Sequence, residues 1–273
     1  MSEIFKDMKD ALLRTIDEQL CAQIDSMFEL EYEELAKFGL TDKPCEILDL
    51  CCGNAYYLIQ LAKKLPSANF TGVDFNVGLC AAAEKNIKNA NMRNIRIIHK
   101  SLFDYEPDRE YNAVITRAAV QYFFSQVDDY LRKVNQCLKD GGILILVEPD
   151  DYFFMFHPEH QIFDKLRDTM NTITARHGGD RYVGRKLPKA MIKAGFKDIK
   201  FVPKIMNNYD IGDRGMFETL RRFPIIVSLM DKELFSDEDA RLAISTLDKI
   251  CDNSGSLITL PIVMVKGTKD SKS

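Results

Sequence analysis

The first half of the chain alternates short apolar runs with segments in which apolar residues recur every three or four positions. This alternation predicts strands followed by amphipathic helices, because each pattern buries one side of its own element. The predicted strands cover residues 46–50, 70–75, 95–99, 111–116 and 143–147. Helices between such strands make right-handed crossovers, which give a mostly parallel sheet covered on both faces. The predicted fold class is therefore α/β, with a doubly wound sheet.

Helical segments flank this core on both sides. Residues 4–38 predict two helices that end at Gly39, and residues 213–252 predict a mainly helical insertion before a last strand at 257–265. Between them lie a predicted helix at 158–176, a helix ending at Ala194 and a strand at 199–202. The apolar faces of the flanking helices need a partner, and the open edge of the sheet offers one. Residues 1–40 and 213–252 are therefore predicted to act as lids.

Composition restricts the functional classes. The 273 residues carry a net charge of −4 and the pI is near 5.7, so we expect no nucleic-acid partner held by a broad basic surface. The longest apolar run, residues 142–147, has the length of a strand, so no membrane association is expected. Seven cysteines without framework spacing, and a start without a signal-peptide apolar region, predict a reduced, cytoplasmic protein.

The most informative segment is Asp49-Leu-Cys-Cys-Gly-Asn-Ala55, directly after the first predicted strand. Open parallel sheets bind ligands beyond the carboxyl ends of their strands. A tight turn against a ligand favours a residue without a Cβ, which is Gly53, and the helix that follows directs free N–H groups at an anion. Asp74 ends the second strand 25 residues after Asp49, where a carboxylate can accept hydrogen bonds from both ribose hydroxyls. The alternative is that both carboxylates only cap the turns in which they lie.

These residues, in this order, resemble the class I S-adenosylmethionine-dependent methyltransferases over roughly residues 46–149. The first motif of that family is Asp-x-Gly-x-Gly-x-Gly. Asp49 and Gly53 match it, whereas Cys51 and Ala55 stand where two glycines are common. The run Asp140-Gly-Gly142 is similar to the signature before the fifth strand of the family. The resemblance implies a seven-stranded, mostly parallel sheet with an antiparallel last strand, and S-adenosyl-L-methionine as the cofactor.

The resemblance also implies a cofactor site and a division of the chain. Residue Ser101 falls where the family usually has an aspartate at the adenine amine, and residues 116–121 match the segment beside the reacting methyl group. The division is a helical lid at 1–40 and a methyltransferase domain at 41–273, with a cofactor core at 46–149, a substrate-side region at 150–212, a cap insertion at 213–252 and a last strand at 257–266. The implied cofactor-binding residues are Asp49, Cys51, Gly53, Asp74, Phe75, Ser101, Leu102, Thr116 and Arg117.

Candidates for the chemistry come from the segments after the fourth and fifth strands, because these pass the crevice. Arg117 is a permanent cation, which a positively charged cofactor would repel, so it is expected to pair with a carboxylate or to bind an anionic substrate group. His157 is a candidate base because histidine titrates near neutrality. The competing hypothesis is that no base exists and that alignment carries the rate. The catalytic candidates are His157, Arg117 and Tyr122, and the substrate-binding candidates are Gln121, Glu148, Asp150, Arg181 and Tyr182.

The leading hypothesis for function is methyl transfer to a small-molecule or peptide nucleophile, with an oxygen, nitrogen or carbon acceptor atom. A nicotinamide-dependent oxidoreductase on a similar sheet is the alternative, but residues 51–56 lack the Gly-x-Gly-x-x-Gly that seats a pyrophosphate. A non-catalytic cofactor-binding homologue is a third possibility. No metal is expected, since Cys51-Cys52 has no second cysteine pair at zinc spacing. Monomer and homodimer are both compatible with the sequence.

Overall fold

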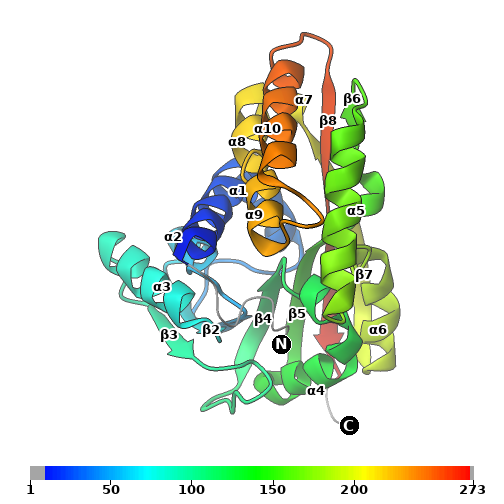
Figure 1. Cartoon of the computed structure of the whole chain (residues 1–273). Helices are drawn as coiled ribbons and strands as arrows, with labels where there is room; N and C mark the ends of the chain where they lie inside the picture. Colours follow the sequence, from blue (N-terminus) through cyan, green and yellow to red (C-terminus); the bar gives the residue numbers. More distant parts are fainter. Residues whose placement is uncertain (1–9, 271–273) are drawn as a thin grey trace.

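A mostly parallel sheet forms the centre of the computed structural model, which describes residues 10–270 (Figure 1). Strands β3, β2, β1, β4 and β5 run parallel in that spatial order, and β8 is antiparallel to both β5 and β7. This arrangement confirms the predicted fold class. The two-residue strand β6 adds to the seven predicted strands. The strands are β1 Glu46–Leu50, β2 Asn69–Asp74, β3 Ile95–His99, β4 Tyr111–Arg117, β5 Leu138–Pro149, β6 Phe156–His157, β7 Phe196–Asn207 and β8 Leu257–Lys269.

Helices cover both faces of this sheet. Successive strand residues point to opposite faces, so Ile47 packs in one apolar cluster with α1 and α2, while Leu48 packs in a second cluster with α4 and α6. Burial on both faces explains why the strands are nearly continuous apolar runs. The helices of the core are α1 Asp10–Lys37, α2 Tyr56–Lys64, α3 Val77–Asn89, α4 Val127–Cys137 and α6 Leu187–Lys193.

A helical cap stands beyond the carboxyl ends of the parallel strands. It consists of α5, α7, α8, α9 and α10, and its buried apolar residues form a third cluster separate from the two in the sheet. Strands β7 and β8 continue from the sheet into this cap, and α7 to α10 connect them (Figure 1). The cap helices are α5 Gln161–Arg176, α7 Asn208–Ile211, α8 Asp213–Leu220, α9 Phe223–Met230 and α10 Asp237–Cys251.

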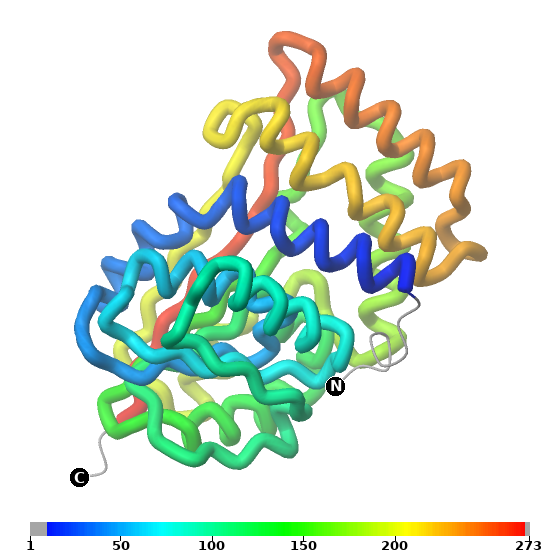
Figure 2. The backbone as a smooth tube through the Cα atoms, turned by 90° about the vertical axis from the view of Figure 1, so that its left-hand side faces the viewer, coloured from blue at the N-terminus to red at the C-terminus, as the bar shows by residue number. Residues whose placement is uncertain are grey.

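Helix α1 connects the core to the cap. Figure 2 shows it lying across the molecule between the α2–α3 side of the core and helices α8 and α9. Its Asp17 accepts a hydrogen bond from Asn54 before α2 (2.7 Å), and its Gln19 donates to the carbonyl of Thr219 in α8 (2.5 Å). The prediction of two helices was wrong, because the described part forms one helix of 28 residues without an internal Gly or Pro to break it. Residues 1–9 of the predicted lid lie outside the described residues.

Three strands are clearly longer than the apolar pattern indicates. Strand β5 begins at Leu138 rather than residue 143, β7 covers residues 196–207 rather than 199–202, and β8 ends at Lys269 rather than residue 265. Half of the residues of β7 are exposed, so its backbone pairing with β8 defines the strand where the apolar pattern does not. Within residues 10–270, no helix has the length and apolar character needed to cross a membrane.

Candidate active site

The loop after β1 has a left-handed backbone at three positions. Cys51, Gly53 and Ala55 have φ angles of 78°, 54° and 57°. The amides of Cys51 and Cys52 both donate to the carbonyl of Val73 in β2, at 2.8 and 3.1 Å, which holds the loop against the neighbouring strand. A left-handed conformation costs a residue other than glycine about 1–2 kcal/mol. The loop therefore keeps, at Cys51 and Ala55, the conformation that glycines would adopt without that cost.

The Asp74 carboxylate at the end of β2 joins this loop to the start of α3. One oxygen accepts from the Gly53 amide at 2.8 Å, and the other accepts from the Asn76 amide at 2.9 Å. Burial raises the pKa of Asp74, while these backbone N–H groups act in the opposite direction. Each carboxylate oxygen can accept more than one hydrogen bond, so Asp74 retains acceptor capacity toward a ligand.

Asp49 lies behind the loop as a buried carboxyl group. Its Oδ1 has no hydrogen-bond partner among the described residues. Burial, and then the charge of Asp74, raise the pKa of Asp49 to about 8, whereas the Arg117 guanidinium lowers it. At pH 7, the folded protein therefore favours the protonated, neutral form of Asp49.

An Asp49→Asn substitution should change how stability depends on pH. Because the pKa rises from 3.8 to about 8 on folding, the folded state holds one proton that the unfolded state has lost between these values. The free energy of unfolding of the wild type should therefore fall, by up to about 1.4 kcal/mol per pH unit, as the pH rises from about 4 to about 8. The variant lacks this proton and should become the more stable protein at pH 8.

Urea unfolding of both proteins at several pH values between 5 and 8 measures this difference. Asp168→Asn, which changes an exposed aspartate, is the matched control and should run parallel to the wild type. Parallel curves for Asp49→Asn and the wild type would show that Asp49 is ionised in the folded protein.

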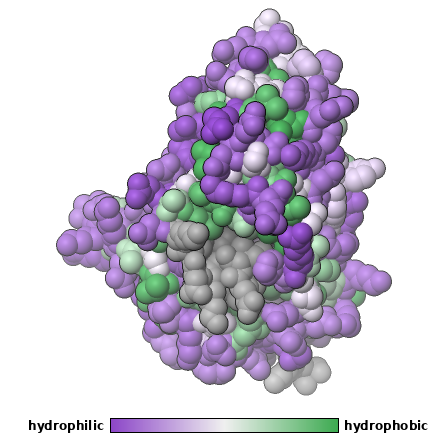
Figure 3. Space-filling model, viewed as in Figure 1, coloured by the Kyte–Doolittle hydropathy of each residue, from purple (hydrophilic) through white to green (hydrophobic). Residues whose placement is uncertain are grey.

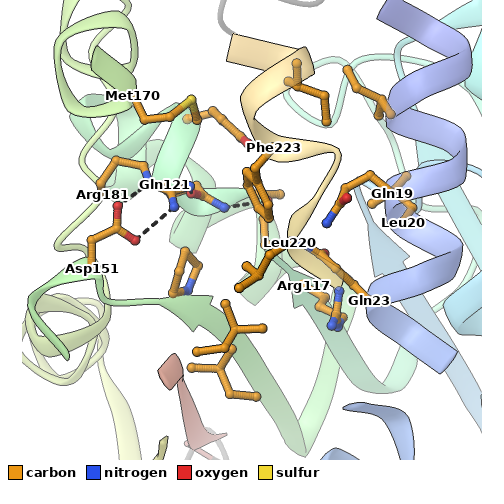
Figure 4. A pocket seen from close by; sticks show the side chains of 18 of the residues that line it. Gln19, Leu20, Gln23, Arg117, Gln121, Asp151, Met170, Arg181, Leu220 and Phe223 are labelled. Carbon is orange, nitrogen blue, oxygen red and sulfur yellow. Dashed lines mark hydrogen bonds and ion pairs between the residues drawn. The ribbon is translucent and has the colours of Figure 1, made fainter. Parts of the chain in front are cut away.

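A pocket lies between the sheet, α1 and the cap (Figure 4). Its core side is formed by the loop after β1, the end of β2 and the first turn of α3, and α1 covers this side with Ile16 and Leu20. Its cap side is formed by α5, α8, α9 and α10. The structure brings eight of the predicted site residues to the lining, namely Cys51, Gly53, Asp74, Phe75, Arg117, Gln121, Tyr122 and Arg181.

The other predicted site residues do not line this pocket. His157 is exposed on β6, so the structure gives no support to a role as the base. Thr116 accepts a hydrogen bond from Tyr130 in the core, and Leu102 is fully buried there. Ser101 accepts from the amide of Phe103. The residues outside the lining are Asp49, Ser101, Leu102, Thr116, Glu148, Asp150, His157 and Tyr182.

Glu148 and Asp150 do not face the pocket. They accept hydrogen bonds from backbone amides and from an arginine next to it. Glu148 is fully buried and accepts from three successive amides, of Ala119, Val120 and Gln121, at 2.8–3.3 Å. Burial raises its pKa to about 7, although these N–H groups oppose the change. Asp150 pairs instead with Arg185, outside the pocket. Both residues therefore fix the backbone of the segments after β4 and β5, which carry residues of the pocket lining.

Arg117 forms the ion pair that its charge predicts. Its Nε and Nη2 donate to the carboxylate of Glu31 in α1, at 2.8–3.2 Å, and its guanidinium lies over the ring of Tyr57. The Arg117 side chain is 8% exposed and that of Glu31 is 0% exposed. This confirms the expected carboxylate partner. Glu31 has a signal in the sequence, since it is a charged residue on the helix face that carries Ile24, Met27, Phe28 and Leu35.

A second ion pair lines the pocket on the cap side. Nε and Nη2 of Arg181 donate to the two oxygens of Asp151, both at 2.8 Å, and its Nη1 donates to Gln121 (Figure 4). Asp150 was the predicted substrate-binding residue, but the neighbouring Asp151 is the residue in the lining. No pattern in the sequence separates these two adjacent aspartates, because the turn Asp151–Phe153 decides which one faces the pocket.

Comparison with known proteins places part of this chain in a described class of domain. Residues 47–142 match the family described as methyltransferase domain. Demethylmenaquinone methyltransferase of Listeria welshimeri is 28% identical over 121 residues, which cover 42% of this chain and 50% of that protein. The chain thus spans about half the length of the curated relatives it matches. Residues 47–142 are thus similar to a methyltransferase domain, and the sheet has the fold of the class I S-adenosylmethionine-dependent methyltransferases.

Solved structures share this fold at low sequence identity. Haemonchus contortus phosphoethanolamine N-methyltransferase 2, in complex with S-adenosyl-L-methionine, aligns with a TM-score of 0.57 and 15% identity, covering 92% of this chain and 56% of that one. The 4+2 cyclase SpnF aligns with a TM-score of 0.54 and 13% identity, covering 88% of this chain and 80% of that one. The family match does not favour the nicotinamide-dependent alternative. The fold by itself does not fix the reaction.

Proposed function

We propose that this protein transfers a methyl group from S-adenosyl-L-methionine to a small-molecule nucleophile bound in the pocket between core and cap. The observation that carries the proposal is the left-handed loop after β1 joined to the Asp74 carboxylate, both on the pocket wall. A switch-point crevice with a turn of this kind and an acidic residue on the next strand suits a nucleoside ligand. The match of residues 47–142 to the methyltransferase domain family supports the same cofactor.

The residues present fit this cofactor. Asp74 would accept the ribose hydroxyls, because it is buried and keeps acceptor capacity beyond its two backbone bonds. Gly53 leaves room at the turn, and Phe75 and Leu79 offer apolar contact for a base on the same wall. Asp49, neutral behind the loop, would support the loop without repelling the carboxylate of the ligand. Neither Ser101 nor Leu102 lines the pocket. In this proposal they support the conformation of the loop after β3 and do not contact the cofactor.

The chain would act mainly by alignment and by excluding water. When bound, S-adenosyl-L-methionine would supply a methyl group already activated on a positively charged sulfur, so the residues of the chain would have only to align the acceptor with it. Helix α1 and residues 213–252 would act as lids, since both line the pocket. Burial raises the pKa of Tyr122, so its hydroxyl stays protonated and would orient the acceptor rather than remove a proton. Orientation of this kind can supply a large share of the rate.

Titration of the protein with S-adenosylhomocysteine and with NAD tests the proposal. S-adenosylhomocysteine should bind and NAD should not, and Asp74→Ala should weaken the binding by about 1–3 kcal/mol, the usual value of hydrogen bonds to a charged group. Asp74→Asn keeps an oxygen for the Gly53 amide, so it separates loss of the ribose contact from collapse of the loop. Unchanged affinity in a folded Asp74→Ala variant would remove Asp74 from the site.

We propose the localisation and the substrate class from composition alone. Seven free cysteines support a reducing, cytoplasmic environment. The net charge of −4 supports a small-molecule substrate rather than a nucleic acid. Size-exclusion chromatography with light scattering would decide between the monomer and the homodimer.

A further inference from the structure

The cap side of the pocket is an apolar chamber. Side chains from β8, the segment before α5, and helices α5, α9 and α10 converge on it, and Figure 4 shows Phe223 and Leu220 in the space between α1 and the Arg181 side. Apolar residues also gather where the cap meets the core on the face seen in Figure 3, while the outer surface of that face is mostly polar. The residues that define the cap chamber are Phe154, Phe163, Met170, Phe223, Ile226 and Leu247.

Each arginine in the lining has its own carboxylate. Arg117 pairs with Glu31 and Arg181 with Asp151, both as buried pairs with two donor nitrogens on one carboxylate. Arg167, at the edge of the chamber, pairs with Asp164 at 2.7 Å. Within residues 10–270, the lining thus offers no unpaired cation for a phosphate or carboxylate. An anion placed there would lose its hydration without gaining a counter-charge.

One polar atom at the chamber lacks a partner. Gln19 projects from α1 toward Leu220 and Phe223 (Figure 4) and is 4% exposed. Its Nε2 donates to the carbonyl of Thr219, which fixes the orientation of the amide, and its Oε1 has no hydrogen-bond donor among the described residues. A buried acceptor without a donor is unfavourable. A ligand hydroxyl or N–H group would supply the missing donor.

From these three observations we infer that the methyl acceptor is a neutral, largely apolar molecule that carries a hydroxyl or N–H group, which donates to Oε1 of Gln19. The inference rests on the proposed function, because it assigns the acceptor of the same reaction. The cap chamber supplies the affinity through burial of apolar surface. Gln19 supplies selectivity, because a ligand without a donor leaves its oxygen unpaired.

Naphthalene derivatives of matched size test this inference, with S-adenosylhomocysteine present and absent. The chain contains no tryptophan, so the naphthalene fluorescence can be followed without tryptophan emission. We expect 1-naphthol to bind, 1-methoxynaphthalene to bind about fivefold more weakly because it lacks the donor, and 1-naphthyl phosphate to bind at least about tenfold more weakly because it is charged. Tighter binding of 1-naphthyl phosphate than of 1-naphthol would overturn the inference.

Variants of Gln19 and of the cap chamber show which residues cause these differences in probe affinity. Gln19→Leu should abolish the difference between 1-naphthol and 1-methoxynaphthalene while leaving the affinity for S-adenosylhomocysteine unchanged. Ile226→Phe should weaken both probes by filling the cap chamber, whereas Ile192→Phe, at an exposed position in α6, should weaken neither. If Gln19→Leu instead weakens S-adenosylhomocysteine, Gln19 serves the cofactor and its assignment to the acceptor is wrong.

The two proposals fail separately in this design. Absence of S-adenosylhomocysteine binding, with the probes still bound, would contradict the methyltransferase proposal. Binding of S-adenosylhomocysteine with no selection among the probes, or with selection for the charged one, would contradict only the assignment of a neutral, apolar acceptor.

Discussion

Replacing Glu31 with alanine should lower the free energy of unfolding by about 3–5 kcal/mol, the usual cost of removing one partner from a buried ion pair. Glu31 is fully buried in α1, and its carboxylate accepts hydrogen bonds from Nε and Nη2 of Arg117. Without Glu31, the Arg117 cation stays buried in the pocket wall. It then has no carboxylate that pairs with it as closely and is not fully hydrated. Urea unfolding followed by circular dichroism measures the loss.

Glu29→Ala is the matched control on the same helix. Glu29 pairs with Lys64, but its side chain is 73% exposed, so its removal should cost less than about 1 kcal/mol. The Glu31→Ala variant should also bind S-adenosylmethionine more weakly relative to S-adenosylhomocysteine, because an uncompensated Arg117 would repel the positive sulfur. Equal losses of stability in the two variants would show that the Arg117–Glu31 pair adds nothing to the connection between α1 and the core.

Gly53→Val should reduce the affinity for S-adenosylhomocysteine by about 100-fold or more, which corresponds to about 2.7 kcal/mol. Gly53 has a φ of 54°, a region that β-branched residues avoid. A Cβ at this position would also lie 3.1 Å from Cδ1 of Leu20 in α1. The side chain would therefore push against the helix that covers the pocket and would displace the amide that Asp74 accepts from. Calorimetric titration of the folded variant measures the change.

Gly141→Val is the control that separates the effect of backbone strain on stability from the loss of ligand binding. Gly141 also has a left-handed φ, of 73°, but a Cβ there would meet nothing within 4 Å, and the residue is remote from the pocket lining. Both variants should lose stability, and only Gly53→Val should lose the ligand. Equal affinities in Gly53→Val and the wild type would show that the loop after β1 does not hold the cofactor.

Local patterns explain why so much of the fold was predictable. Strand Ile95–His99 matches the prediction residue for residue, because its run of apolar residues is a local signal. Gly53 and Asp74 follow from the same kind of reasoning, since their positions relative to strand ends fix where they lie. Their contact with each other confirms only that the loop and β2 meet at this edge.

Contacts between distant segments explain what the sequence did not reveal. Glu31 and Arg117 are 86 positions apart, and Gln19 meets Thr219 across 200 positions. Nothing local indicates these partners, because the path of α1 between core and cap depends on the packing of the whole chain. His157 shows a different limit of sequence reasoning. It was a chemical candidate because histidine is a common general base, but β6 carries it to the surface.

The cap chamber was not predictable for a related reason. The residues that define it come from three cap helices, α5, α9 and α10, and from the segment before α5, and each of these contributes only one or two of them. In the sequence, these residues belong to ordinary amphipathic helices whose apolar faces suit a packed core equally well. Only the assembled cap shows which members of its apolar cluster, such as Phe163, Met170 and Leu247, also line the pocket.

The central claim, methyl transfer in this pocket, is tested most directly by mass spectrometry of an apolar metabolite mixture incubated with the protein and S-adenosylmethionine labelled in its methyl group. We expect that a neutral metabolite gains one labelled methyl group, that S-adenosylhomocysteine forms in equal amount, and that both products are lost in Gly53→Val but not in Gly141→Val. Binding of S-adenosylmethionine with no labelled product above the level of Gly53→Val would contradict the account and would leave a protein that holds the cofactor without transferring its methyl group.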